Sequence, residues 1–146
     1  MQVDFYQLSR DPLDKVVPLL AGKVVAAGAK LSIAVADDDR RQKLADALWA
    51  QPAPAFLANG MVGDDHAARQ PILLGPDCST ANGATMTLLA DGVWRETAEQ
   101  FERAILLFDD TAIADARALW KQFSGRDDRQ NRFFKQDDAG RWSIAG

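Results

Sequence analysis

Hydrophobic and polar positions follow one another along this chain in a pattern that predicts alternating strands and helices. Residues 3–8, VDFYQL, alternate and are rich in β-branched and aromatic side chains, which predicts a first strand. Asp11 and Pro12 then stand in the cap-then-proline order that begins a helix, and Gly28 is a natural end for that helix. Pro18 interrupts the helical pattern, so we expect either a helix that begins near Pro18 or an irregular first turn.

The stretch from residue 31 to residue 59 predicts a buried strand followed by an amphipathic helix. Residues 31–36, LSIAVA, are a continuous apolar run, as in strands covered on both faces. Apolar side chains then recur at helical spacing, Asp37 supplies an N-cap, and Pro52 prevents the helix from continuing. Trp49 and Phe56 have two interpretations: they are core residues, or they form an exposed apolar surface for a partner protein.

The rest of the chain continues the alternation of strands and helices. In order, we expect a loop over residues 59–71, short strands at 72–74 and 86–89, helical spacing from Trp94 to Phe101, a final strand at 105–108 and a final helix at 111–123. This order predicts an α/β fold: a three-layer αβα sandwich with a largely parallel central sheet, built as a single domain over residues 1–146.

Composition and charge narrow the class of protein. The chain has 146 residues, 47% of them hydrophobic and 26% charged, and no apolar run of membrane-spanning length, so we expect a cytoplasmic protein with no membrane contact. Its single cysteine, Cys78, fits a reducing compartment. The net charge of -4 is the wrong sign for a protein that grips nucleic acid through phosphates. Residues 117–146 nevertheless hold seven Lys or Arg against four Asp, which gives a locally basic surface that suits an acidic peptide or carboxylate at least as well as it suits DNA.

Residues for catalysis or for a cofactor are missing from the sequence. The apolar run before Asp109 and Asp110 resembles a strand that positions magnesium, but no G-x-x-x-x-G-K-[ST] phosphate loop occurs, so helix capping is the better interpretation. His66 is the only histidine, which excludes a zinc site with several histidine ligands. A Ser-His-Asp or Cys-His set would have to use His66, which lies in a predicted polar loop, so we do not expect one. We therefore expect no catalytic residue, no cofactor and no metal.

The predicted final helix carries the most suggestive arrangement of side chains. Arg117 and Lys121 are four residues apart, so their charges project together beside the ring of Trp120. Two cations next to an aromatic surface can hold a carboxylate while an apolar group packs alongside. The alternative is a solvated basic edge with Trp120 simply buried.

Several segments together resemble the chi subunit family of the bacterial DNA polymerase III holoenzyme, a part of the clamp-loader assembly. The matching segments are FYQL in the first strand, KLADALWAQPAPAFLANG, the glycine-and-acid loop that leads to Pro71, LLF before Asp109, and ARALWKQF at residues 116–123. The most specific of them is DALWAQPAPAF, from Asp46 to Phe56, whereas residues 125–146 match only loosely.

The resemblance implies a non-enzymatic adaptor whose α/β fold resembles a nucleotide hydrolase without a phosphate loop. It implies a contact with the psi subunit through the apolar surface that contains Trp49, Pro52 and Phe56. It also implies a contact with the acidic, phenylalanine-ended tail of single-stranded DNA-binding protein, with the family's basic site mapped onto Arg117 and with Trp120 and Lys121 in the same helix. Any contact with DNA would then be indirect.

Two other classes of function remain open from the sequence. A magnesium-dependent nucleotide-binding enzyme would need Asp37, Asp38 and Asp109 to gather one metal ion. A direct binder of single-stranded DNA would use the basic C-terminal segment, with Trp142 and Phe134 as stacking platforms.

Overall fold

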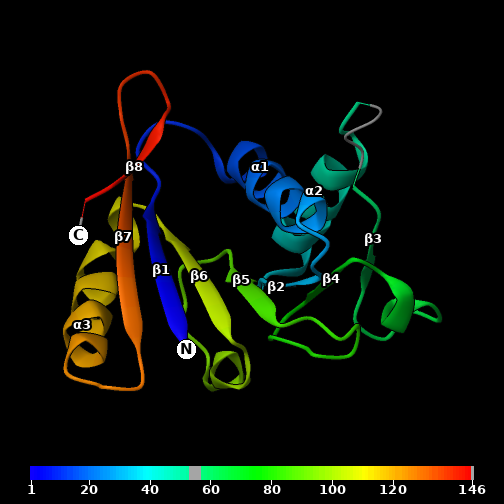
Figure 1. Ribbon diagram of the computed structural model, residues 1–146. Helices are drawn as coiled ribbons and strands as arrows, with labels where there is room; N and C mark the ends of the chain where they lie inside the picture. Colours follow the sequence, from blue (N-terminus) through cyan, green and yellow to red (C-terminus); the bar gives the residue numbers. More distant parts are fainter. Residues whose placement is uncertain (53–56, 146) are drawn as a thin grey trace.

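One mixed sheet forms the centre of the protein. A computed structural model describes residues 1–52 and 57–145, and within them the strands follow the order β3-β4-β2-β5-β6-β1-β7-β8 (Figure 1). The strands are β1 (Gln2–Gln7), β2 (Leu31–Ala34), β3 (Asn59–Met61), β4 (Ile72–Gly75), β5 (Met86–Leu89), β6 (Arg103–Phe108), β7 (Gln130–Gln136) and β8 (Trp142–Ile144). All pairings are parallel except that of β7 with β8, which confirms the largely parallel sheet.

Helices cover both faces of the sheet. The helices α1 (Leu13–Ala26) and α2 (Asp38–Trp49) pack on one face, and α3 (Ile113–Ser124) packs on the other with the 3-10 helix η2 (Glu96–Gln100). Two consecutive residues of β1 show this division: Phe5 packs in the same cluster as Phe123 of α3, whereas Tyr6 packs in the cluster that contains the buried side of α1. The three-layer α/β sandwich is therefore confirmed. No helix within the described ranges is long and apolar enough to cross a membrane.

The predicted start of α2 and the predicted end of α1 are confirmed, but Asp11 does not cap α1, because Pro12 is the N-cap and no side chain within the described residues makes a capping hydrogen bond there. The Asp37 side chain accepts a hydrogen bond from the Arg40 N–H at 2.8 Å and caps α2, and Gly28 takes a φ of +80° just after the end of α1. The helix α1 does not begin near Pro18, because Pro18 lies buried inside it. Its first turn is not irregular either, because the Val16 N–H makes the ordinary i, i+4 bond to the Pro12 carbonyl at 3.1 Å, and the Lys15 N–H shares that carbonyl as is common at helix ends.

Two predictions for the middle of the chain are wrong. Residues 59–71 are not entirely loop, because β3 pairs with β4 and a 3-10 helix, η1 (Ala67–Arg69), follows it. A three-residue edge strand that contains Asn59 and Gly60 shows no apolar alternation, so the sequence pattern could not reveal it. The helical spacing from Trp94 to Phe101 corresponds to the 3-10 helix η2 rather than to an α-helix.

The predicted end of the sheet is also wrong. The strand at residues 105–108, within β6, is not the last one, because β7 and β8 follow α3 and extend the sheet beyond β1. The sequence of β7, QNRFFKQ, is mostly polar, and its Phe133 and Phe134 point to opposite faces of the sheet. Half-buried strands at the edge of a sheet lack the continuous apolar run that identified β2 and β6.

Candidate functional site

The helix α3 begins at the carboxyl end of β6. Asp109 follows that strand, and its side chain accepts hydrogen bonds from the Thr111 hydroxyl and from the Thr111 N–H, the latter at 3.0 Å. These bonds cap the short 3-10 helix η3 (Asp110–Ala112), which leads into α3. The Thr111 hydrogen bonds hold the pKa of the Asp109 carboxyl below its usual value. Asp109 therefore caps a helix, as predicted.

An open groove runs between α3 and the edge of the sheet. It has a volume of about 730 Å³ and is lined by Arg117, Ala118, Trp120 and Lys121 of α3, Phe133 of β7 and Ala145. The structure thus brings the three residues predicted from the final helix, Arg117, Trp120 and Lys121, to one side of one groove. The sequence did not point to Phe133 or Ala145, because the strand that carries Phe133 was not predicted.

Aromatic rings form the apolar part of the groove. Trp120 is half-buried, and its ring meets Phe5 edge-on at 5.2 Å and Phe133 at 5.9 Å between ring centroids. Asn131 of β7 ties this strand to the helix, since its Nδ2 donates to the Trp120 carbonyl at 3.4 Å. The rings are therefore held in place by both the sheet and the helix, with the groove side of Trp120 left accessible.

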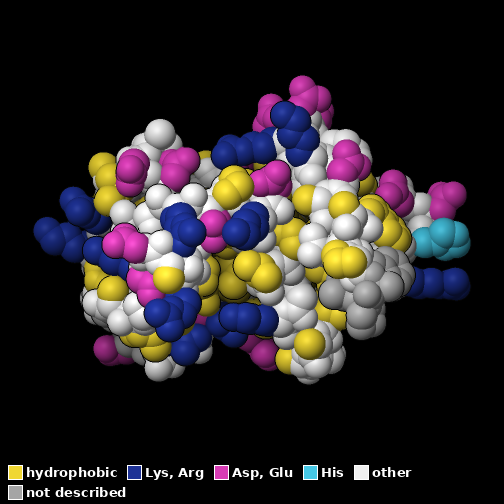
Figure 2. Space-filling model, turned by 90° about the horizontal axis from the view of Figure 1, so that it is seen from above, with side chains coloured by type: hydrophobic (Ala, Val, Ile, Leu, Met, Phe, Trp, Pro, Cys, Tyr) yellow, Lys and Arg dark blue, Asp and Glu magenta, His cyan; other side chains and the backbone are white. Residues whose placement is uncertain are grey.

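The charge of the groove is positive. Arg117 and Lys121 are exposed, and none of the ion pairs within the described part of the chain involves either side chain. The Lys135 ammonium lies 5.9 Å from the centroid of the Phe133 ring and adds a third cation beside the groove. Seen from above, several Lys and Arg side chains lie at the end of the molecule where α3 and β7 lie, with Asp and Glu side chains among them (Figure 2). This combination of cations and rings suits a carboxylate that is attached to an apolar group.

A second exposed surface surrounds the end of α2. Trp49 is the last residue of α2 and is 50% exposed, and Pro52 is exposed as well. The interpretation of Trp49 as a core residue is therefore wrong, because Leu44, Ala45 and Leu48 already fill the side of α2 that packs inward. Phe56, the third residue of the predicted psi surface, lies outside the described residues.

The aspartates at the carboxyl ends of the strands have structural partners. Asp37 and Asp109 cap helices, and Asp38 forms an ion pair with Arg41. Asp91 accepts a hydrogen bond from the Ala36 N–H at 3.0 Å and forms an ion pair with Arg95. No group of three or more His, Cys, Asp or Glu that could hold a metal ion occurs among residues 1–52 and 57–145. Asp37, Asp38 and Asp109 therefore form no such group within the described residues.

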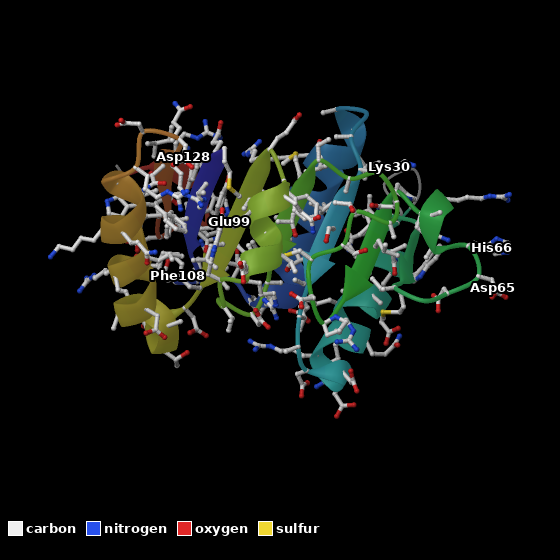
Figure 3. All side chains as sticks on the ribbon, turned by 90° about the horizontal axis from the view of Figure 1, so that it is seen from below. Lys30, Asp65, His66, Glu99, Phe108 and Asp128 are labelled. Atoms are coloured by element: carbon white, nitrogen blue, oxygen red, sulfur yellow. The ribbon has the colours of Figure 1, made fainter. Side chains whose placement is uncertain are left out.

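The other residues considered for chemistry are placed apart from the groove. His66 and Asp65 are exposed on a loop at the end of the molecule opposite α3 (Figure 3). Cys78 is buried, and its burial raises the pKa of the thiol, which opposes formation of a thiolate nucleophile.

The two aromatic rings considered for stacking on DNA bases contact the protein's own core. Phe134 stacks on Tyr6 at 4.5 Å between centroids, and Trp142 meets Tyr6 edge-on at 5.1 Å. These contacts compete with base stacking, which needs a free ring face. They do not favour direct binding of single-stranded DNA.

The fold and the groove define a three-layer α/β domain with a positively charged, aromatic-lined site between its last α-helix and the edge of its sheet. The chain belongs to the DNA polymerase III chi subunit family: the family model described as DNA polymerase III chi subunit, HolC, matches residues 1–129. A comparison with curated proteins found no match. Family membership makes the chain an accessory subunit of DNA polymerase III, in DNA replication. The match ends before β7, so Phe133 and Ala145 of the groove lie beyond the matched residues.

Proposed function

We propose that this chain is a non-catalytic adaptor that links the clamp loader of DNA polymerase III to single-stranded DNA-binding protein. The groove beside α3 binds the acidic tail of that protein, which ends in phenylalanine. The observation that carries the proposal is the placement of Arg117 and Lys121, both without an ion-pair partner in the described chain, beside the half-buried Trp120 and Phe133.

Each part of the tail has a matching part of the groove. Arg117 pairs with the terminal carboxylate or an adjacent aspartate, since a guanidinium holds a carboxylate through two parallel hydrogen bonds. Lys121 adds positive field, and the phenylalanine packs against Trp120 and Phe133. The contact is weak and salt-sensitive, because the two cations are exposed.

A titration with a fluorescent acidic peptide that ends in phenylalanine tests this function. We expect saturable binding that weakens when the terminal carboxylate is amidated. Arg117→Ala should lower the affinity by about 1 to 3 kcal/mol, because a charge-assisted pair is lost. Arg69→Ala removes an exposed arginine at the end of η1 and should leave the affinity unchanged. If the folded Arg117→Ala protein binds as tightly as the wild type, Arg117 is not part of the site.

We further propose that the exposed surface at the end of α2 binds the psi subunit. Its support is the 50% exposure of Trp49 and the exposure of Pro52, since a large aromatic residue at the surface is a common anchor of protein interfaces. Trp49→Ala should abolish co-purification with psi and leave the affinity for the acidic peptide unchanged. Retention of psi by this variant would remove Trp49 from the interface.

A further inference from the structure

The strand β7 is only partly paired on its outer side. On its inner side it pairs with β1 from Gln130 to Lys135. On its outer side β8 pairs only with Phe134 to Gln136, so β8 lies beside only the upper part of β7 (Figure 1). One further hydrogen bond, from the Ala145 N–H to the Phe133 carbonyl at 2.7 Å, extends this pairing by one residue.

The direction of each backbone group along β7 follows from two hydrogen bonds. The Gln130 N–H donates to the Met1 carbonyl at 3.0 Å, so the backbone groups of Gln130 face β1. Because these groups alternate along a strand, those of Asn131 and Phe133 face away from β1, and the bond between Phe133 and Ala145 agrees with this. The N–H and C=O of Asn131 therefore point out of the sheet edge, where no strand of the described chain pairs with them.

This open edge borders the groove. Phe133, two residues after Asn131, lines the groove, and the Asn131 side chain contacts the Trp120 carbonyl on its opposite wall. Asn131 does not itself line the groove, but an extended peptide that lies in the groove and continues along β7 from Phe133 toward Gln130 comes alongside the free backbone groups of Asn131. The positive charge of the groove and the lack of an acidic side chain among the described residues that line it favour an acidic peptide as the occupant.

We propose that the acidic peptide adds to the sheet as a short strand, with its main chain hydrogen-bonded to the N–H and C=O of Asn131. This inference rests on the function proposed above and specifies how the peptide is held. Strand addition to a sheet edge supplies main-chain hydrogen bonds that are independent of side-chain sequence. Under this arrangement Arg117 and Lys121 select for acidic residues, while Asn131 fixes the path of the peptide.

Amide hydrogen exchange followed by nuclear magnetic resonance tests the proposal on the unmodified chain. The Asn131 amide should exchange quickly in the free protein and slow at least about fivefold when the acidic peptide saturates the groove, because it gains a hydrogen bond. The Gln130 amide, already bonded to Met1, is the internal control and should change little. Unchanged exchange at Asn131 with the peptide bound would overturn the proposal.

A pair of variants isolates the Asn131 N–H. Both Asn131→Pro and Asn131→Ala lose the side-chain amide, but only the proline variant loses the N–H, and proline is tolerated where that N–H faces out of an edge strand. We expect the proline variant to bind the peptide about five- to tenfold more weakly than the alanine variant. Equal affinities of the two folded variants would contradict strand addition.

Peptides that are N-methylated at one amide at a time provide a second test if the proline variant does not fold. Methylation of the amide that faces the Asn131 carbonyl should weaken binding by a similar factor, whereas methylation of its neighbours should not. A flat profile, combined with binding that still depends on Arg117, would refute strand addition alone. Absence of binding by the unmodified peptide would instead refute the proposed function.

Discussion

Asp4 is a charged residue on β1, an interior strand of the sheet. Its side chain is fully buried on β1 and is held by Arg103 of β6, with 2.9 Å between Nε and Oδ2, and by Arg132 of β7, with 3.0 Å between Nε and Oδ1. Burial raises the pKa of Asp4, but hydrogen bonds from Arg132, Gln2 and Arg103 outweigh it and lower the pKa below its usual value. This carboxylate joins three neighbouring strands, including the one that borders the groove.

Asp4→Asn should destabilise the protein by about 2 to 3 kcal/mol at neutral pH. This is somewhat below the usual loss for a broken buried pair, because Arg103 and Arg132 keep about a third of their side chains in water. Urea unfolding of the wild type and the variant measures the difference. Asp138→Asn, which neutralises an exposed carboxylate, is the matched control and should cost little.

The difference in unfolding free energy between the wild type and Asp4→Asn should depend on pH. A lowered pKa in the folded state means that Asp4 contributes its full stability above the unfolded value of about 3.9, and that this contribution is lost as the pH falls through the lowered pKa. The difference in unfolding free energy between wild type and Asp4→Asn should therefore stay constant down to about pH 5 and shrink below about pH 4. A constant difference across the acid range would show that the charge of Asp4 is not what stabilises the sheet.

At the scale of elements, the groove depends on the packing of α3 against β7 and on the segment that follows β8. The Ala145 N–H bonds to Phe133, so residue 145 stands at the wall of the groove opposite the cations. Ala145→Asp should lower the affinity for the acidic peptide by roughly 1 to 2 kcal/mol through like-charge repulsion. Ala139→Asp makes the same change in net charge on the turn between β7 and β8, and it should have little effect. Equal losses of peptide affinity in the two variants would show that the affinity depends on the net charge of the protein and not on the position of the new carboxylate.

The elements differ in how far the sequence could predict them. The helix α3 was predictable because Ala116, Trp120 and Phe123 repeat at helical spacing, and the i, i+4 spacing of Arg117 and Lys121 placed both cations on the groove side. The strands β3, β7 and β8 were not predictable, since edge strands are short or polar and are defined by their pairing partners. The Asp4 cluster was hidden for a similar reason, because its arginines come from strands far apart in the sequence.

At the scale of the whole molecule, two electrostatic effects of opposite sign act on an acidic partner. The net charge is -4, yet residues 117–146 carry seven Lys or Arg and four Asp, so the protein as a whole repels the peptide while the groove attracts it. Salt screens both effects, with a Debye length of about 10 Å at 0.1 M. The short-range attraction dominates at the groove, so we expect the affinity of the wild type to fall as salt is added.

Removal of Arg117 and Lys121 together should flatten the dependence of the affinity on salt. In Arg117→Ala with Lys121→Ala the local attraction is reduced to that of Lys135, while the long-range repulsion grows, so the weak residual affinity should change much less with salt than that of the wild type. Lys43→Ala with Arg69→Ala changes the net charge equally at exposed positions of α2 and η1, and should keep the falling affinity of the wild type. Fluorescence anisotropy of the acidic peptide over a series of ionic strengths distinguishes the two double variants. If the groove variant still loses affinity with salt as steeply as the wild type, the attraction comes from cations elsewhere on the molecule.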